Sequence, residues 1–109
     1  MHYNVKSIAV FERQAKRLIK KYPSLKTELV QLIQLLKKSP EQQGTSLGNS
    51  CYKIRMSIAS KGKGKSGGAR VITHLQILQS TVFLLSVYDK SEQTDISDSE
   101  LKDLLKLLQ

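Results

Sequence analysis

The sequence predicts an α+β domain with the element order β-α-α-β-β-β-α: an antiparallel sheet with an N-terminal helical hairpin and a C-terminal helix. Three observations support this fold class. Residues 8–38 place apolar side chains at the 3.6-residue period of helices. Residues 51–88 change first to a period of two and then to β-rich apolar runs. Residues 97–108 combine helix-start signals with a leucine stripe. The length of 109 residues fits one domain, which we expect to span 1–109.

The first third of the chain predicts a short strand and two helices. Tyr3 to Lys6 is predicted as an edge strand, after which Ser7 is placed to cap a helix. The apolar stripe of this helix consists of Ile8, Phe11, Ala15, Leu18, Ile19 and Tyr22. After Pro23-Ser24 a second helix presents Leu25, Leu29, Leu32, Ile33 and Leu36, and it ends before Pro40. So short a turn predicts an antiparallel helix pair.

The middle of the chain predicts three strands. Residues 41–50 are polar and contain glycine, so they are predicted as a loop. Residues 51–58 alternate in a way that is typical of a half-buried strand, with Lys53 and Arg55 on one face. The runs 71–78 and 81–88 are separated by Gln79-Ser80, which predicts a tight hairpin. Both runs are apolar at nearly every position, as expected for strands covered on both faces.

The last helix has the clearest start signal in the chain. Ser97 and Glu100 have the spacing of a capping box, and Ile96 and Leu101 occupy the positions of a hydrophobic staple. Asp98 and Glu100 also suit the positive end of the helix dipole. One helical face then carries Leu101, Leu104, Leu105 and Leu108.

The charge of the chain is +9 and is unevenly distributed. Residues 42–88 contain six bases and no acid, whereas residues 89–109 contain six acids and three bases. Such a basic excess favours a polyanionic partner, most commonly the phosphate backbone of a nucleic acid. One cysteine and two distant histidines predict neither a disulfide nor a metal site. No stretch is apolar enough to predict a signal peptide or a membrane span, so we expect a cytoplasmic protein without a membrane partner.

The segment from Ala59 to Ser66 matches a loose phosphate-loop pattern, A-S-K-G-K-G-K-S. That mechanism requires a helix that starts at the Lys-Ser pair and offers its free N–H groups to the phosphates. Here two glycines and a β-run follow instead. The residues that follow the pattern therefore disfavour a nucleotide hydrolase.

Four cations are predicted to converge on the sheet face that the helices leave open: Lys53, Arg55, Arg70 and Lys90. Lys53 and Arg55 share a strand face, Arg70 begins the next strand, and Lys90 follows the last one. Such a cluster can hold a phosphodiester and neutralise the charge that develops in its transition state. In RNA the 2′-hydroxyl supplies the nucleophile, so cleavage needs neither a cofactor nor a metal.

Three segments resemble the RelE/HigB group of bacterial type II toxins: C-Y-K-I-R at 51–55, G-K-S-G-G-A-R-V-I at 64–72 and L-L-S-V-Y-D-K-S-E at 84–92. The resemblance implies the RelE/ParE toxin fold and an endonuclease that cuts mRNA in the A site of the 70S ribosome. It also implies a cognate antitoxin as partner. Lys53, Arg55, Arg70 and Lys90 fall on the family's catalytic positions. Ile96 stands near the place of the family's C-terminal tyrosine, which leaves the general acid and base unassigned.

Several alternatives remain open at this point. Lys61, Lys63 and Lys65 are predicted to contact RNA, or else form a solvated loop. Tyr88 is predicted to stack on a base, or else fills the end of the sheet. Lys53 and Arg55 also fit the solvated side of a two-faced strand. The alternative function is a ParE-like inhibitor of DNA gyrase, which acts by binding; a further one is a homologue that has lost activity and only binds nucleic acid.

Overall fold

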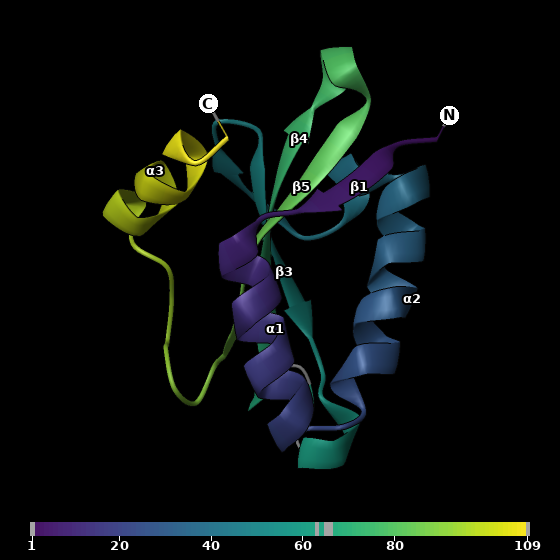
Figure 1. The fold of residues 1–109 in the computed structure, drawn as a ribbon, viewed down its shortest axis with the longest axis vertical. Helices are drawn as coiled ribbons and strands as arrows, with labels where there is room; N and C mark the ends of the chain where they lie inside the picture. Colours follow the sequence, from purple (N-terminus) through teal and green to yellow (C-terminus); the bar gives the residue numbers. More distant parts are fainter. Residues whose placement is uncertain (1, 63, 65–66, 109) are drawn as a thin grey trace.

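The computed structural model describes residues 2–62, 64 and 67–108, in which a five-stranded sheet has helices on both faces (Figure 1). The strand order across the sheet is β1-β5-β4-β3-β2. The bounds are β1 Asn4–Ser7, β2 Thr45–Gly48, β3 Cys51–Met56, β4 Ala69–Gln76 and β5 Thr81–Asp89. The predicted α+β class is confirmed, with all pairs antiparallel except β1–β5, which is parallel.

Helices α1 (Ala9–Lys21) and α2 (Leu25–Lys38) pack as a hairpin on one face of the sheet (Figure 1). Their buried side chains form a core with the sheet residues that point toward them, including Leu18, Leu32, Ile54, Val71 and Val87. On the other face, α3 (Asp98–Lys106) contributes Leu101 to a second core, together with Cys51, Ile72, Leu85 and Tyr88. The central strands β4 and β5 are therefore buried on both sides, as their apolar sequences predict.

The predicted N-terminal edge strand is confirmed, but the predicted helix cap is wrong. Ser7 is still part of β1, where it pairs with Leu84, and Ile8 takes the cap position of α1. The Ser7 hydroxyl instead donates a hydrogen bond to the Glu12 carboxylate at 2.7 Å. Pairing with β5 extends the strand by one residue and so displaces the start of the helix.

The segment 41–50, predicted as a loop, contains the additional elements η1 (Pro40–Gln42) and β2. Strand β2 pairs with the free edge of β3, and Asn49 and Ser50 connect the two with φ angles of 54° and 58°. Two consecutive positive φ values are what a two-residue type I′ hairpin turn requires. Asn-Ser is an unusual pair for this turn, and the strand itself is too short and polar to predict from sequence.

The predicted boundaries of the next strands are shifted. Strand β3 ends at Met56, not at residue 58, and β4 begins at Ala69, not at residue 71. The connection to β5 includes a 3₁₀ turn, η4 (Ile77–Gln79), and Ser80 at a φ of 47°. Ile77 and Leu78 thus leave the strand, and Leu78 is 94% exposed at the hairpin tip.

The turn before β4 depends on a glycine. After η2 (Ala59–Lys61) the chain returns to the sheet, and the backbone of Gly68 approaches the Met56 carbonyl so closely that a Cβ would collide with it. The Gly68 carbonyl accepts a hydrogen bond from the Lys90 N–H at 2.9 Å. Gly68 therefore joins the ends of three strands just before Arg70. Strand β4 begins directly after it at Ala69, so the helix that a phosphate loop needs does not follow the glycines.

The capping box predicted for α3 is confirmed. The N–H of Glu100 donates to the Ser97 hydroxyl at 3.1 Å, and the Glu100 carboxylate accepts from the Ser97 N–H at 3.4 Å. None of the helices in the described part of the chain has the length and apolar character of a membrane span.

Candidate functional site

Arg55, Arg70 and Tyr88 form a row across three neighbouring strands. Arg55 lies directly opposite Arg70 in the β3–β4 pairing, and Arg70 lies opposite Tyr88 in the β4–β5 pairing. Because side chains alternate along a strand, the row lies on the face that also carries Lys53 and the α3 core. The neighbours Ile54 and Val71 point to the α1–α2 face. The structure thus brings the predicted bases of β3 and β4 together.

This face is less open than the sequence predicts. Helix α3 and Ile96 pack over the second core, which includes Tyr88. The row lies at the end of the sheet where β3 leaves for η2, and its members differ in accessibility. Arg55 is exposed, whereas Arg70 is only 3% and Tyr88 only 4% exposed. The reason is that β4 and β5 are central strands, while Arg55 lies nearer the edge of the sheet.

Arg70 is a buried guanidinium beside a second one. Its Nη1 donates a hydrogen bond to the carbonyl of the preceding residue, Ala69, at 3.1 Å. Burial lowers the pKa of Arg70, and the charge of Arg55 lowers it further. An arginine remains charged after such a shift because its ordinary pKa is so high. The pair therefore concentrates positive charge at one point of the sheet.

Asp95 is a carboxylate that sequence reasoning missed and that lies beside the cluster, paired with Lys53. Its Oδ1 accepts a hydrogen bond from Lys53 Nζ at 3.0 Å, and it also accepts one from the Ile96 N–H at 2.8 Å. The hydrogen bond from Lys53 lowers the pKa of Asp95, and the charge of Lys90 contributes in the same direction. The Asp95 charge in turn raises the pKa of Tyr88 and partly offsets the lowering of the pKa of Arg70.

The charge of Lys90 also acts on this carboxylate, so Lys90 lies on the Asp95 side of the sheet end. Lys90 follows the last residue of β5, and its N–H is fixed by the Gly68 carbonyl. Of the four bases chosen from the sequence, Lys53 thus contacts Asp95, and the charges of Arg70 and Lys90 interact with it. The excess of acids over bases in residues 89–109 signalled that such a carboxylate exists. The sequence does not show which of these acids pairs with which base.

Tyr88 has an unusual hydroxyl. Its ring is packed among the apolar residues of the second core, and its Oη is fully buried without a hydrogen-bond partner among the described residues. Burial raises the pKa of Tyr88, and the nearby Asp95 charge raises it further. The Asp95 carboxylate also raises this pKa as a weak hydrogen-bond acceptor would, but its contact with the hydroxyl falls short of the distance and angle of a full hydrogen bond. The phenol is therefore protonated at neutral pH.

Lys61 lies apart from this cluster. Its Nζ donates to the Asp89 carboxylate at 2.5 Å and to the Ser91 hydroxyl at 2.8 Å, and it lies 5.6 Å from the Tyr22 ring centre. Asp89 is completely buried and also accepts a hydrogen bond from the Tyr22 hydroxyl. The structure thus engages Lys61 in a buried ion pair between β5, η2 and α1. Lys63 and Lys65, which are also predicted to contact RNA, lie outside the described residues.

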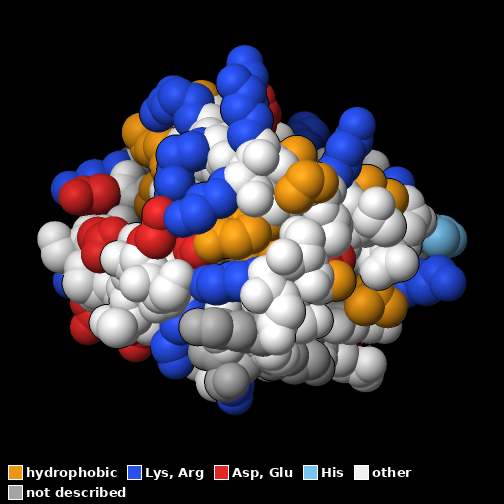
Figure 2. Space-filling view, turned by 90° about the horizontal axis from the view of Figure 1, so that it is seen from below, with side chains coloured by type: hydrophobic (Ala, Val, Ile, Leu, Met, Phe, Trp, Pro, Cys, Tyr) orange, Lys and Arg blue, Asp and Glu red, His pale blue; other side chains and the backbone are white. Residues whose placement is uncertain are grey.

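Burial alone raises the pKa of Asp89, but the hydrogen bond from Lys61, with those from Ser91 and Tyr22, outweighs burial. The net effect holds the pKa of Asp89 well below its ordinary value. A second acid, Glu92, pairs with Arg17 at 2.8 Å and lies 3.6 Å from Lys21. Seen from the end where α1 finishes, Lys and Arg side chains nevertheless predominate over one broad area of the surface (Figure 2).

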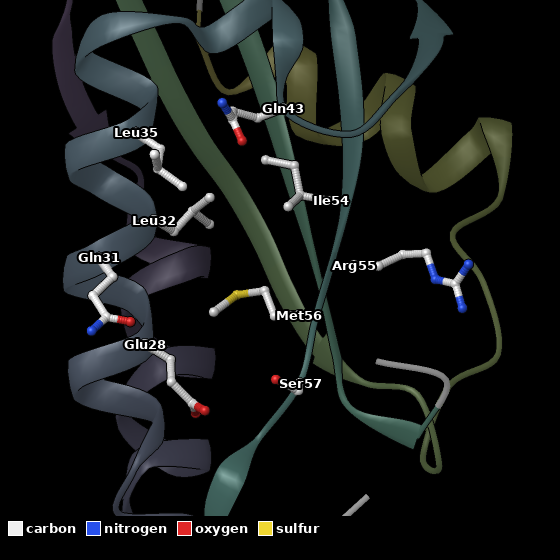
Figure 3. A pocket seen from close by; sticks show the side chains of 9 residues that line it. All are labelled: Glu28, Gln31, Leu32, Leu35, Gln43, Ile54, Arg55, Met56 and Ser57. Atoms are coloured by element: carbon white, nitrogen blue, oxygen red, sulfur yellow. The ribbon is translucent and has the colours of Figure 1, made fainter. Parts of the chain in front are cut away.

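A groove between α2 and β3 lies on the opposite side of the sheet from the cluster. Its lining includes Glu28, Leu35, Ile54 and Met56, whose side chains point into it, whereas Arg55 points away to the other face (Figure 3). Arg55 thus borders the groove but directs its side chain to the face that carries Arg70.

Other candidates for chemistry have clear structural roles. The Cys51 Sγ lies 3.5 Å from His74 Nδ1, but burial raises the pKa of Cys51 to about 11, so the thiol is not a nucleophile at neutral pH. Burial also lowers the pKa of His74. Within the described residues, no group of three His, Cys, Asp or Glu side chains is arranged to hold a metal ion.

The chain is similar to known toxins over nearly its whole length. A family model described as the RelE toxin of the RelE/RelB toxin–antitoxin system matches residues 8–109. The fold is similar to an Escherichia coli RelE double arginine-to-alanine mutant in the free state, with a TM-score of 0.63, 18% identity and 100% of each chain covered. The isolated E. coli RelE toxin gives a TM-score of 0.54 and 19% identity, with coverage of 96% of this chain and 98% of that chain. The toxin–antitoxin complex RelBE2 from Mycobacterium tuberculosis gives a TM-score of 0.60 and 16% identity, with coverage of 82% of this chain and 92% of that chain.

Proposed function

The chain belongs to the RelE family of toxins from toxin–antitoxin systems, and from this membership we propose that it is a ribosome-dependent endoribonuclease that cleaves mRNA in the ribosomal A site. The observation that carries this proposal is the row of Arg55, Arg70 and Tyr88, flanked by Lys53 and Lys90. A protein that only binds its target does not need a buried arginine beside a second arginine. Phosphodiester cleavage gains from such a pair, because negative charge builds up on the phosphate oxygens.

In the proposed reaction the 2′-oxygen of the mRNA attacks the adjacent phosphorus and gives up its proton to water. The bond from phosphorus to the 5′-oxygen breaks, and that oxygen takes a proton from water, so that a 2′,3′-cyclic phosphate and a 5′-hydroxyl result. Arg70 stabilises the charge on the phosphate oxygens. Arg55 and Lys53 hold the phosphate from the exposed side, and Lys90 adds positive charge at the end of β5. The side chains supply this charge, so the proposed reaction is independent of a metal.

The RNA displaces Asp95 in this proposal. The Asp95 side chain is 61% exposed and is held by a Lys53 side chain that is 26% exposed. Such an accessible ion pair contributes at most about 1 kcal/mol, so a phosphate that several cations bind can replace the carboxylate. Lys61 has a structural role here because Asp89 and Ser91 already engage its ammonium group.

We also propose that a cognate antitoxin binds this chain. The RelBE2 structure is a toxin–antitoxin complex, and its fold likeness supports such a partner. The charge of +9 suits a partner with acidic surface. Co-expression with the product of a neighbouring small gene tests this: a stable co-purifying complex and restored growth are expected, and independent behaviour of the two proteins would contradict the proposal.

The central experiment is a cleavage assay with ribosomes that carry a defined mRNA, with and without the purified chain. Primer extension should show cuts within the A-site codon, and removal of the ribosomes should abolish them. Arg70→Ala should lose about 10²–10³-fold in rate. Arg70→Met retains the side-chain volume and tests whether a cavity is the cause. Lys26→Ala, which removes an exposed charge on α2, is the matched control and should cleave normally.

A DNA gyrase supercoiling assay runs in parallel with the cleavage assay. Intact transcripts together with inhibited supercoiling would overturn the ribonuclease proposal in favour of a gyrase inhibitor. Intact transcripts with unaffected gyrase would indicate a homologue without either activity.

A further inference from the structure

The Tyr88 hydroxyl is the one buried side-chain polar atom in the described part of the chain that lacks a hydrogen bond. Buried polar groups in folded proteins are nearly always paired, because an unpaired one loses its bonds to water without replacement. Phenylalanine at this position would fill the same space without that cost. The hydroxyl therefore requires an explanation outside the packing of the free protein.

The surroundings of Tyr88 direct its hydroxyl toward the basic cluster. Its ring is held by the second core, including Ile72, Leu85 and Leu101, so the phenol has a fixed position. Arg70 is its cross-strand partner, and the charges of both Arg70 and Asp95 act on the phenol. The hydroxyl thus lies within reach of the Asp95 charge, which a bound phosphate would replace.

Access to this hydroxyl depends on the segment between β5 and α3. Ile96 packs on the second core, and Asp95 holds the segment to Lys53 through an ion pair at 3.0 Å. The Asp95 side chain is largely exposed, so water and salt weaken its attraction to Lys53. When RNA displaces Asp95, the scissile phosphate takes its place near the hydroxyl, which then faces oxygens that gain negative charge during the reaction.

We propose that Tyr88 is a catalytic residue of this chain, whose hydroxyl donates a hydrogen bond to the scissile phosphate as negative charge accumulates on its oxygens. This role rests on the proposed ribonuclease function and names a further group for the same reaction. Tyr88 keeps its proton throughout. The bond from phosphorus to the 2′-oxygen forms and the bond to the 5′-oxygen breaks, while water takes the proton of the 2′-hydroxyl and supplies one to the 5′-oxygen. Arg70 supplies charge to the phosphate, and Tyr88 supplies a fixed donor beside it.

The test is Tyr88→Phe in the ribosome-dependent cleavage assay, with kcat and KM measured separately. We expect kcat to fall about 10²-fold or more and KM to stay within about threefold, because the lost bond forms only in the transition state. Thermal unfolding should occur at the same or a higher temperature, since an unpaired buried hydroxyl is removed. If the variant does not fold, Tyr88→Leu provides a second chain without the hydroxyl.

The matched control is Tyr52→Phe. It makes the same change on β3, on the sheet face opposite to that of Tyr88, and should leave kcat unchanged. Tyr88→Phe cleaving at the wild-type rate, while Arg70→Ala is inactive, would overturn the role of Tyr88 and leave the ribonuclease function intact. A wild-type chain that leaves every transcript whole would overturn both together.

Discussion

Arg55 and Arg70 lie directly opposite each other on β3 and β4, two like charges in one cross-strand pair. Opposed like charges destabilise an antiparallel pair, and burial of Arg70 increases this cost. Arg55 also lowers the pKa of Arg70. Such an arrangement is favourable when an anion binds between the two guanidinium groups. Removal of one of the two charges should therefore raise the stability of the free protein and lower its activity.

Arg55→Gln should stabilise the free protein and impair cleavage. Removal of the like charge should raise the free energy of unfolding by about 0.2–1 kcal/mol, measured by urea denaturation. The rate of mRNA cleavage should fall because the phosphate loses one of its ligands. Arg13→Gln, an exposed arginine on α1, is the control for a change of net charge. A less stable Arg55→Gln protein would contradict the repulsion argued from the pairing.

Asp95→Asn should strengthen RNA binding. Asparagine keeps an oxygen for the Ile96 N–H but removes the charge that Lys53 neutralises. We expect affinity for a 2′-O-methylated RNA, which cannot be cleaved, to rise up to about fivefold in fluorescence anisotropy. The dependence of log affinity on log salt should steepen by about 0.7, because one more cation is available to a phosphate of a single strand.

The control for this prediction is Asp103→Asn on α3, where the carboxylate is exposed and lies 4.0 Å from Lys106. It changes the net charge equally but lies outside the cluster. Equal affinity changes in the two variants would show that net charge, and not the position of Asp95, is responsible.

Lys61→Met should destabilise the protein strongly. Asp89 is completely buried, and loss of its partner leaves an uncompensated charge, which costs about 3–5 kcal/mol. Urea denaturation measures this loss, with Lys26→Met as the control on an exposed surface. The double variant Lys61→Met/Asp89→Asn should recover part of the stability because the buried charge is gone. Little change for Lys61→Met would instead indicate that this lysine is available to RNA.

The free energy of unfolding should fall as the solution is acidified. The pKa values of Asp89, Glu92 and Asp95 all lie below their ordinary values in the folded chain, so the unfolded chain takes up protons first. Their stabilising contribution is present above the ordinary pKa values of 3.8 to 4.5 and is lost as pH falls through the lower folded values. Denaturation at a series of pH values from about 6 downward checks this. Asp89→Asn should flatten the acid limb, and a wild-type protein that gains stability on acidification would contradict the sign.

The site depended on two kinds of information. The alternation along β3 and the strand after the glycines were sufficient to group Lys53, Arg55 and Arg70. They were not sufficient to find that Arg70 and Tyr88 are buried, because burial depends on where α3 and the segment before it pack. The strand β2 escaped prediction for a similar reason: its residues have little β propensity, and the free edge of β3 gives it a partner.

Periodicity and capping within short segments determined the α+β class, the helical hairpin and the start of α3, since these depend on neighbours a few residues apart. The sequence by itself also determined the separation of charge into a basic body and an acidic C-terminal segment. Only the tertiary structure decided how the two meet: Asp89 neutralises Lys61, Glu92 pairs with Arg17, and Asp95 pairs with Lys53. The physical reason is that ion pairs between residues 28 to 75 positions apart leave no local pattern, and folding of the chain alone brings them together.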